Sequence, residues 1–292
     1  MSKNTANTEG KARGQGYFVW QRLKRNRGAM VGLVFLAFLV VLMISADFLF
    51  DYDDVVIKQN VSERLQGPSA EHWFGTDESG RDILARVIHG ARRSVLIAAV
   101  AVICATLVGG ALGAIAGFFG GLLGELIMRF MDVLLAIPST LFGLIIIASL
   151  GSSIPNLILS VTVPTIPKMA RILRSSVMTQ AGSDYAEAAR ARGATNSRIL
   201  FNHILPNSIA PVFVQFTISV GTTIILLSGK SFLGLGIQPP TPEWGAMLSN
   251  ARTYIRDYSY MCMFPGLAIL FTILSLNLLG DGLRDALDPK LK

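Results

Sequence analysis

The residues best suited to a specific chemical role lie in one polar segment, 184–206, which reads DYAEAARARGATNSRILFNHILP. Strong helix formers predict a short helix over Tyr185–Arg192. Ser183 or Asp184 can cap its start, and Gly193 can end it. Three arginines can form bidentate contacts with acidic groups: Arg190, Arg192 and Arg198. The predicted chemistry is docking to a partner protein. An ordinary amphipathic loop with positive charge is the alternative that spacing alone leaves open.

The other candidate residues do not have the spacing that a nucleotide-binding or metal-binding site requires. The triplet Gly229-Lys230-Ser231 resembles the end of a phosphate-binding loop, but Ile224 stands where that loop needs its first glycine. The histidines and cysteines share no metal-ligand spacing: His72, His89, His203, Cys104 and Cys262. We therefore expect no catalytic residue, no metal and no cofactor bound by this chain.

The composition indicates a membrane protein. Of the 292 residues, 51% are hydrophobic and only 15% are charged, whereas a soluble domain carries roughly 25% charged residues. The mean hydropathy is +0.51. The net charge of +7 comes from Lys and Arg at the ends of apolar segments, which argues against nucleic-acid binding.

Six apolar segments predict an all-α membrane protein with six transmembrane helices: 29–50, 94–119, 126–150, 154–169, 209–227 and 261–279. The fourth is short and has prolines near its ends, so a buried re-entrant segment is the alternative there. The predicted domains are a basic tail at 1–28, an outer loop at 51–93, a five-helix core at 94–283 with a cytoplasmic loop at 176–207, and a C-terminus at 284–292.

Basic residues set the orientation. The N-terminal tail, the 168–207 loop and the C-terminus hold most of the Lys and Arg. Cytoplasmic segments carry this excess, so both termini should face the cytoplasm.

Glycines recur every four residues in the second apolar segment, at Gly109, Gly113, Gly117 and Gly121. This spacing places them on one helical face, where another helix can approach closely. A sliding contact and plain tight packing are both consistent with the pattern.

Ionisable residues are nearly absent from the central turns of the apolar segments. An ion-coupled carrier normally needs such residues. Four charges lie near the inner ends of the third and fourth segments and are interpreted as interfacial: Arg129, Asp132, Arg171 and Arg174. A translocator without a proton relay or nucleotide loop needs energy from a partner.

The docking segment resembles the EAA loop of permease subunits in bacterial ATP-binding-cassette importers. That pattern appears here as Glu187-Ala188-Ala189, then Gly193, then His203-Ile204-Leu205-Pro206. His203 replaces the usual isoleucine of the general pattern, and HILPN is typical of the peptide-importer branch. Three further stretches resemble the C-type permease of dipeptide, oligopeptide, glutathione and nickel systems: 72–82, 232–248 and 278–292.

The resemblance implies a type I importer transmembrane domain in the bacterial inner membrane. A B-type permease, two ATPase subunits and an extracytoplasmic binding protein would be its partners, with ATP and Mg on the ATPases. It implies that the helix over 185–198 couples to one ATPase, through Asp184, Tyr185, Glu187, Ala188, Ala189, Arg190, Arg192, Gly193, Arg198 and Pro206.

The expected function is therefore that of a non-catalytic permease subunit. Di- or oligopeptides are the expected solutes, with glutathione and nickel chelates as alternatives. The competing classes are a channel or ion-coupled carrier and a membrane scaffold. The sequence does not identify the substrate-binding residues.

Overall fold

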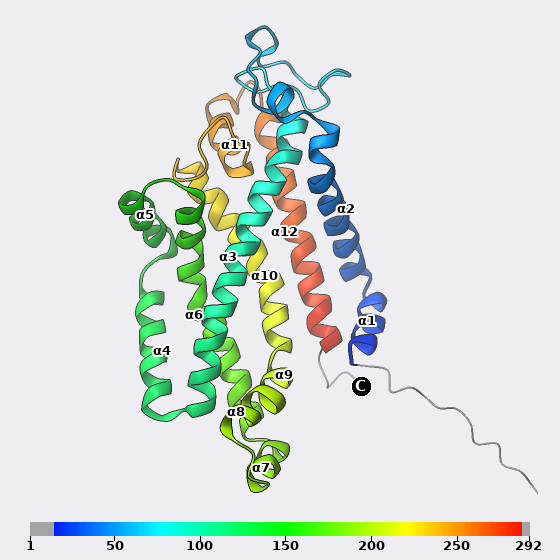
Figure 1. Ribbon diagram of the computed structural model, residues 1–292. Coiled ribbons are helices and arrows are strands. Elements are labelled where there is room, and N and C mark those ends of the chain that lie inside the picture. The colour runs from blue at the N-terminus through cyan, green and yellow to red at the C-terminus, as the bar shows by residue number, and fades with distance from the viewer. Residues whose placement is uncertain (1–14, 288–292) are drawn as a thin grey trace, which may run out of the picture.

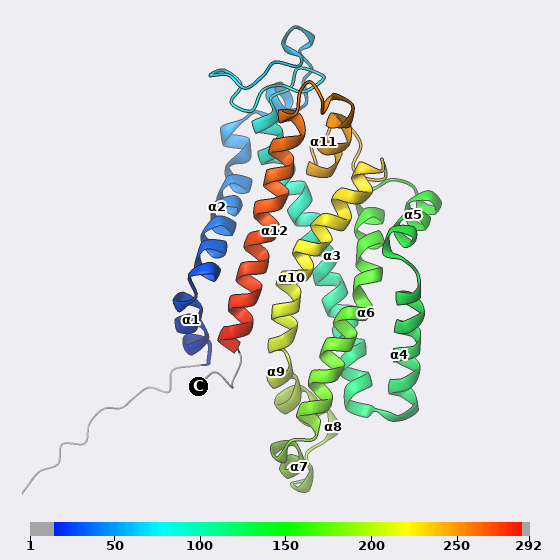
Figure 2. The same cartoon turned by 180° about the vertical axis from the view of Figure 1, so that it is seen from behind.

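Helices make up most of the chain in the computed structural model, which describes residues 15–287 (Figure 1). The helices run roughly along one axis. The segment between α2 and α3, predicted to be an outer loop, lies at one end of this bundle, and α1, α7 and the C-terminal end of α12 lie at the other (Figures 1 and 2). In keeping with that prediction, the first end is called outer and the second inner. The longer helices are α1 (Gln15–Arg25), α2 (Arg27–Leu49), α3 (Ile83–Phe119), α4 (Gly121–Ala136), α5 (Ser139–Leu150), α6 (Ile154–Ala181), α10 (Ala210–Phe232) and α12 (Tyr260–Leu287).

Short helical elements connect these helices. They are η1 (Tyr52–Ile57), η2 (Val61–Glu63), α7 (Asp184–Ala191), α8 (Asn196–Arg198), η3 (Ile199–Ile204), α9 (Leu205–Ser208), α11 (Trp244–Ala251) and η4 (Arg252–Tyr254).

Four helices are long and apolar enough to span a membrane: α2, α3, α10 and α12. The third expected segment, 126–150, is not one continuous helix, because α4 and α5 meet at a bend of 84°. Pro138 lies at that bend and has no N–H with which to continue a helix. The pair forms either a fifth, broken span or a re-entrant loop.

The fourth segment, expected to be short, forms instead the 28-residue helix α6. It includes Pro164 and Pro167, and its inner half carries Lys168, Arg171 and Arg174. These charges explain why hydropathy gave a segment ending at residue 169. They also keep α6 out of the set of clear spans, so the count of six spans stays a prediction.

The second helix begins earlier than hydropathy indicates, at Ile83 rather than near residue 94. The Asp82 carboxylate accepts a hydrogen bond from the Ala85 N–H at 2.9 Å and caps this start. Arg86 is buried and donates to the backbone carbonyls of Val56 at 2.7 Å and Pro240 at 3.2 Å. Polar side chains that have hydrogen-bond partners thus allow α3 to begin before its apolar part.

The glycine stripe of α3 faces α6. A methyl group at Gly109 would lie 2.5 Å from the Ile166 carbonyl oxygen, and one at Gly113 would collide with the Ala170 carbonyl. At Gly117 it would lie 2.7 Å from the Arg174 carbonyl oxygen. Missing side chains therefore let the two backbones touch. Gly121 does not share this contact, because α3 ends at Phe119 and nothing lies within 4 Å of a Cβ at Gly121.

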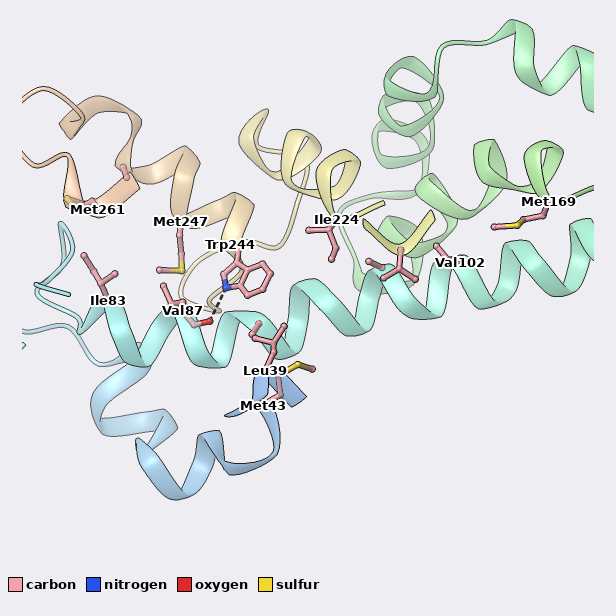
Figure 3. Packing of buried hydrophobic residues seen from close by; sticks show 14 residues of the cluster. Leu39, Met43, Ile83, Val87, Val102, Met169, Ile224, Trp244, Met247 and Met261 are labelled. Atoms are coloured by element: carbon pink, nitrogen blue, oxygen red, sulfur yellow. Dashed lines mark hydrogen bonds between the residues drawn. The ribbon is translucent and has the colours of Figure 1, made fainter. Parts of the chain in front are cut away.

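The largest buried cluster joins the outer half of α3 to α11 (Figure 3). Trp244 is fully buried there, and its indole N–H donates to the Val87 carbonyl at 2.9 Å. The buried Glu243 carboxylate accepts hydrogen bonds from Ser94 Oγ and from the N–H groups of Gly245 and Ala246. Glu243 therefore caps α11 and ties it to α3.

Lys230 belongs to α10 rather than to an outer loop, and its side chain is buried. Its Nζ donates to the Ser160 carbonyl at 2.7 Å and to Ser160 Oγ at 3.0 Å. Pro164, four residues after Ser160, cannot supply the usual helical N–H to that carbonyl. The ammonium group therefore satisfies a carbonyl that the proline leaves open.

Gly113→Ala tests the α3–α6 contact. The added methyl meets backbone, which cannot move aside cheaply, so we expect a loss of about 1–3 kcal/mol of stability. Gly110→Ala is the matched control, because its methyl would make only an ordinary 3.5 Å contact with Leu173. Thermal unfolding of the two purified variants in detergent is the measurement. Equal melting temperatures for both variants would contradict the assigned contact.

Candidate coupling surface

The polar segment singled out by the sequence forms the tip of the end where α1 and the C-terminal end of α12 lie (Figure 1). α7 begins directly after Ser183, and Asp184 and Glu187 lie in its first turn, where the helix dipole favours acids. The Ser183 side chain does not cap α7; its hydroxyl instead donates to the Gln180 carbonyl of α6 at 2.6 Å. The Tyr185 hydroxyl donates to Gln180 Oε1 at 2.6 Å. Both bonds fasten the start of α7 to α6.

Gly193 ends this helix as expected. Its φ of +78° is the left-handed conformation that glycine adopts without steric cost. Its N–H donates to the Arg190 carbonyl at 2.9 Å, and the next N–H, of Ala194, donates to Ala189 at 3.1 Å. The chain then reverses toward α8, which Thr195 caps.

One side of α7 is anchored on the chain itself. Ala186 is completely buried, and Ala189 is half-buried against the apolar cluster below α7. That cluster combines α6, η3 and α10 through Leu173, Val177, Ile199, Leu200, Ile204 and Val212. Small residues thus let α7 lie close against the bundle end.

The other side of α7 and the turn after it are exposed. Most of the residues expected to contact an ATPase lie there: Asp184, Tyr185, Glu187, Ala188, Arg190, Arg192, Gly193 and Arg198. Within residues 15–287, the three arginines of this set form no ion pair. Their charges are available to an acidic partner surface.

Residues 196–208 continue as a widened helical stretch through η3. Leu205 N–H bonds to Leu200, five residues back, and Pro206 follows it on the exposed surface. Pro206 therefore lies at the re-entry into the bundle and does not join the α7 surface directly. Phe201 is 61% exposed on this stretch, and sequence reasoning did not single it out because it lies in an apolar run.

The predicted glycine set and the predicted coupling set both adjoin α6. It contacts Gly109, Gly113 and Gly117 of α3 along its length and ends at Ala181, shortly before α7 begins. The structure therefore links the two sets through α6.

This architecture is that of a membrane-embedded permease. The model of the family described as "Binding-protein-dependent transport system inner membrane component" matches residues 109–292. A second model, the N-terminal TM domain of oligopeptide transport permease C, matches residues 16–68. The chain belongs to the first of these families, and it is a multi-pass permease subunit of an ATP-binding-cassette importer in the bacterial inner membrane.

Curated relatives include permeases named for dipeptides and for glutathione. The chain is 44% identical to a dipeptide transport system permease protein, DppC, of Alkalihalophilus pseudofirmus, covering 94% of this chain and 89% of the relative. It is 43% identical to a di/tripeptide permease of Pseudomonas aeruginosa, covering 94% and 91%. It is also 44% identical to the glutathione permease GsiD of Escherichia coli, covering 94% and 90%.

Solved structures agree on the fold. An inward-facing MetNI methionine ABC transporter covers 70% of this chain and 97% of its own, with a TM-score of 0.58 at 17% identity. An amino acid ABC transporter covers 69% and 94%, with a TM-score of 0.51 at 16% identity.

Two alanine substitutions separate the two sides of α7. Ala186→Leu should force α7 off the bundle, because no space exists for the larger side chain. Ala188→Leu places the same side chain on the exposed side and should leave the helix in position. Limited proteolysis of the 184–206 segment should therefore accelerate only in Ala186→Leu. Equal cleavage rates in the two variants would contradict the assigned burial.

Proposed function

We propose that this chain pairs with a B-type permease to form the translocation path for di- or oligopeptides. In this assembly α7 is the coupling helix of a subunit that has no catalytic activity of its own. The exposed side of α7 inserts into a groove of one ATPase subunit, and an extracytoplasmic binding protein delivers the solute at the opposite end. One observation carries the proposal: α7 is anchored on one side and presents uncompensated arginines on the other.

The anchoring explains how force enters the bundle. ATP shifts an equilibrium only by interacting unequally with two states. ATP binding closes the ATPase dimer and moves the groove that holds α7. Since Ala186 and the cluster beneath it fix α7 to α6, the movement passes to α6 and then to α3.

The peptide assignment follows from the relatives, which include dipeptide and di/tripeptide permeases. Glutathione is the second candidate, because glutathione permeases match over the same length at similar identity. Nickel chelates are the third. A stand-alone channel, an ion-coupled carrier or a scaffold does not fit a member of this family.

Co-purification tests the coupling role. Glu187→Ala and Gly193→Val should lose the ATPase subunits in detergent. The first removes an acid from the contact, and the second imposes left-handed strain of roughly 1–2 kcal/mol on a non-glycine residue. Glu125→Ala is the control, because it removes an exposed acid from α4, away from α7. Retention of the ATPases and of uptake in both α7 variants would refute the coupling role.

Uptake by the reconstituted complex tests the solute. Proteoliposomes containing both permeases and both ATPases, supplied with the cognate binding protein, should accumulate labelled dialanine in an ATP-dependent manner. Competition between dialanine and glutathione then ranks the two candidates. Accumulation of glutathione without dialanine would replace the first candidate by the second.

A further inference from the structure

One face of α6 is polar and exposed in a helix that otherwise packs against apolar neighbours. Lys168, Arg171, Ser175 and Thr179 recur at helical spacing and are all exposed in the chain. α6 runs between α4 and α10, with α3 on its far side (Figure 2). The glycine contacts to α3 use a different set of α6 residues, around Ala170. The polar face is therefore left uncovered by this chain.

The position of Lys168 along α6 argues against an interfacial position for this residue. Lys168 follows Ile154, the start of α6, by 14 positions. At about 1.5 Å per residue, Lys168 lies about 21 Å from the outer end. A hydrocarbon core is about 30 Å thick. With α6 taken as the fourth predicted span, the backbone at Lys168 would lie about 9 Å inside the core even if the whole excess length of α6 projected on the inner side.

A second observation marks the same face as one that avoids lipid. Arg171 Nη2 lies 2.6 Å from Asp132 Oδ1, which joins α6 to α4 through an ion pair. Both side chains are about half exposed in this chain. Charged groups within a membrane face the protein interior or a water-filled path, because lipid cannot solvate them. The face between α4 and α6 is therefore expected to meet protein or water rather than lipid.

Lys168 and Arg171 differ in what they can still bind. The Arg171 guanidinium already forms an ion pair with Asp132. Lys168 makes no hydrogen bond or ion pair with any other residue in 15–287. Its ammonium group has three donors and no partner. A cation without a competing ion-pair partner suits a transport path, where binding must be strong enough to admit a solute and weak enough to release it.

We propose that Lys168 lines the aqueous translocation path and transiently binds the carboxylate of the passing peptide. This inference rests on the proposed function and adds a solute contact within this chain. Peptides with a free C-terminus carry that carboxylate, as does glutathione. The same contact would thus serve both solute candidates.

Cysteine labelling tests whether the face is wet. In the full nucleotide-free complex, with Cys104 and Cys262 replaced by Ala, Lys168→Cys should react with an anionic, membrane-impermeant thiosulfonate. Val34→Cys, on the exposed apolar face of α2, should remain unreactive. Labelling of Lys168→Cys as slow as that of Val34→Cys would show that lipid or the partner permease covers the face, and would overturn the proposal.

Transport of dialanine tests the role of the charge. At saturating binding protein, Lys168→Gln should lower uptake roughly tenfold or more, the change that losing a hydrogen bond to a charged group produces. Lys168→Arg should retain most of it. The ATPase activity stimulated by the loaded binding protein should change less than twofold in each. Arg129→Gln is the matched control, because it removes one positive charge from the exposed side of α4.

Normal dialanine uptake by Lys168→Gln would overturn the proposal. Failure of the proposed function can be distinguished from failure of the Lys168 inference. If the unmodified complex takes up glutathione and not dialanine, the same variants are compared with glutathione. If it takes up neither while Lys168→Cys is labelled, the solute assignment and the carboxylate contact both fall, and the coupling role of α7 is judged by co-purification alone.

Discussion

At Gly109, Gly113 and Gly117 the backbones of α3 and α6 come so close that no side chain fits between them. This contact sets the distance between α3 and α6, and neighbouring helices pack around the pair. α3 has 37 residues and therefore extends about 55 Å. Its outer end holds the segment before it through Arg86, and its inner half holds α6, which leads directly into α7. The contact thus connects the two ends of the molecule.

The elements around this pair are held by different means. On one side, Glu243 and Trp244 fix α11 to α3 through buried hydrogen bonds, which have well-defined geometry. On the other side, α4 and α5 meet at a sharp bend and reach α6 through the Arg171–Asp132 pair and through the Asn156 side chain, which donates to the Leu150 and Gly151 carbonyls. The polar contacts that fix α11 to α3 are therefore buried, whereas those of the α4–α5 arm are exposed.

The sequence predicted the class of fold because hydropathy and charge are direct consequences of a lipid solvent. It also predicted the α7 helix and its end, since Gly193 and the alanines act through local propensity. It misjudged α6, because hydropathy treats Lys168 and Arg171 as the end of a segment and cannot see that protein or water faces them. The break at Pro138 was missed for the opposite reason: continuous apolar sequence hid a local backbone constraint. The burial of Ala186 and the exposure of Phe201 depend on tertiary packing, which spacing does not reveal.

The Lys230–Ser160 contact bears on how the bundle is assembled. As newly made helices leave the insertion machinery, α10 brings an ammonium ion into the bilayer, and α6 brings a carbonyl without its helical donor. Either group alone is poorly tolerated in hydrocarbon, and each relieves the cost of the other. The contact therefore favours entry of α6 and α10 into lipid as a pair over entry of either helix alone.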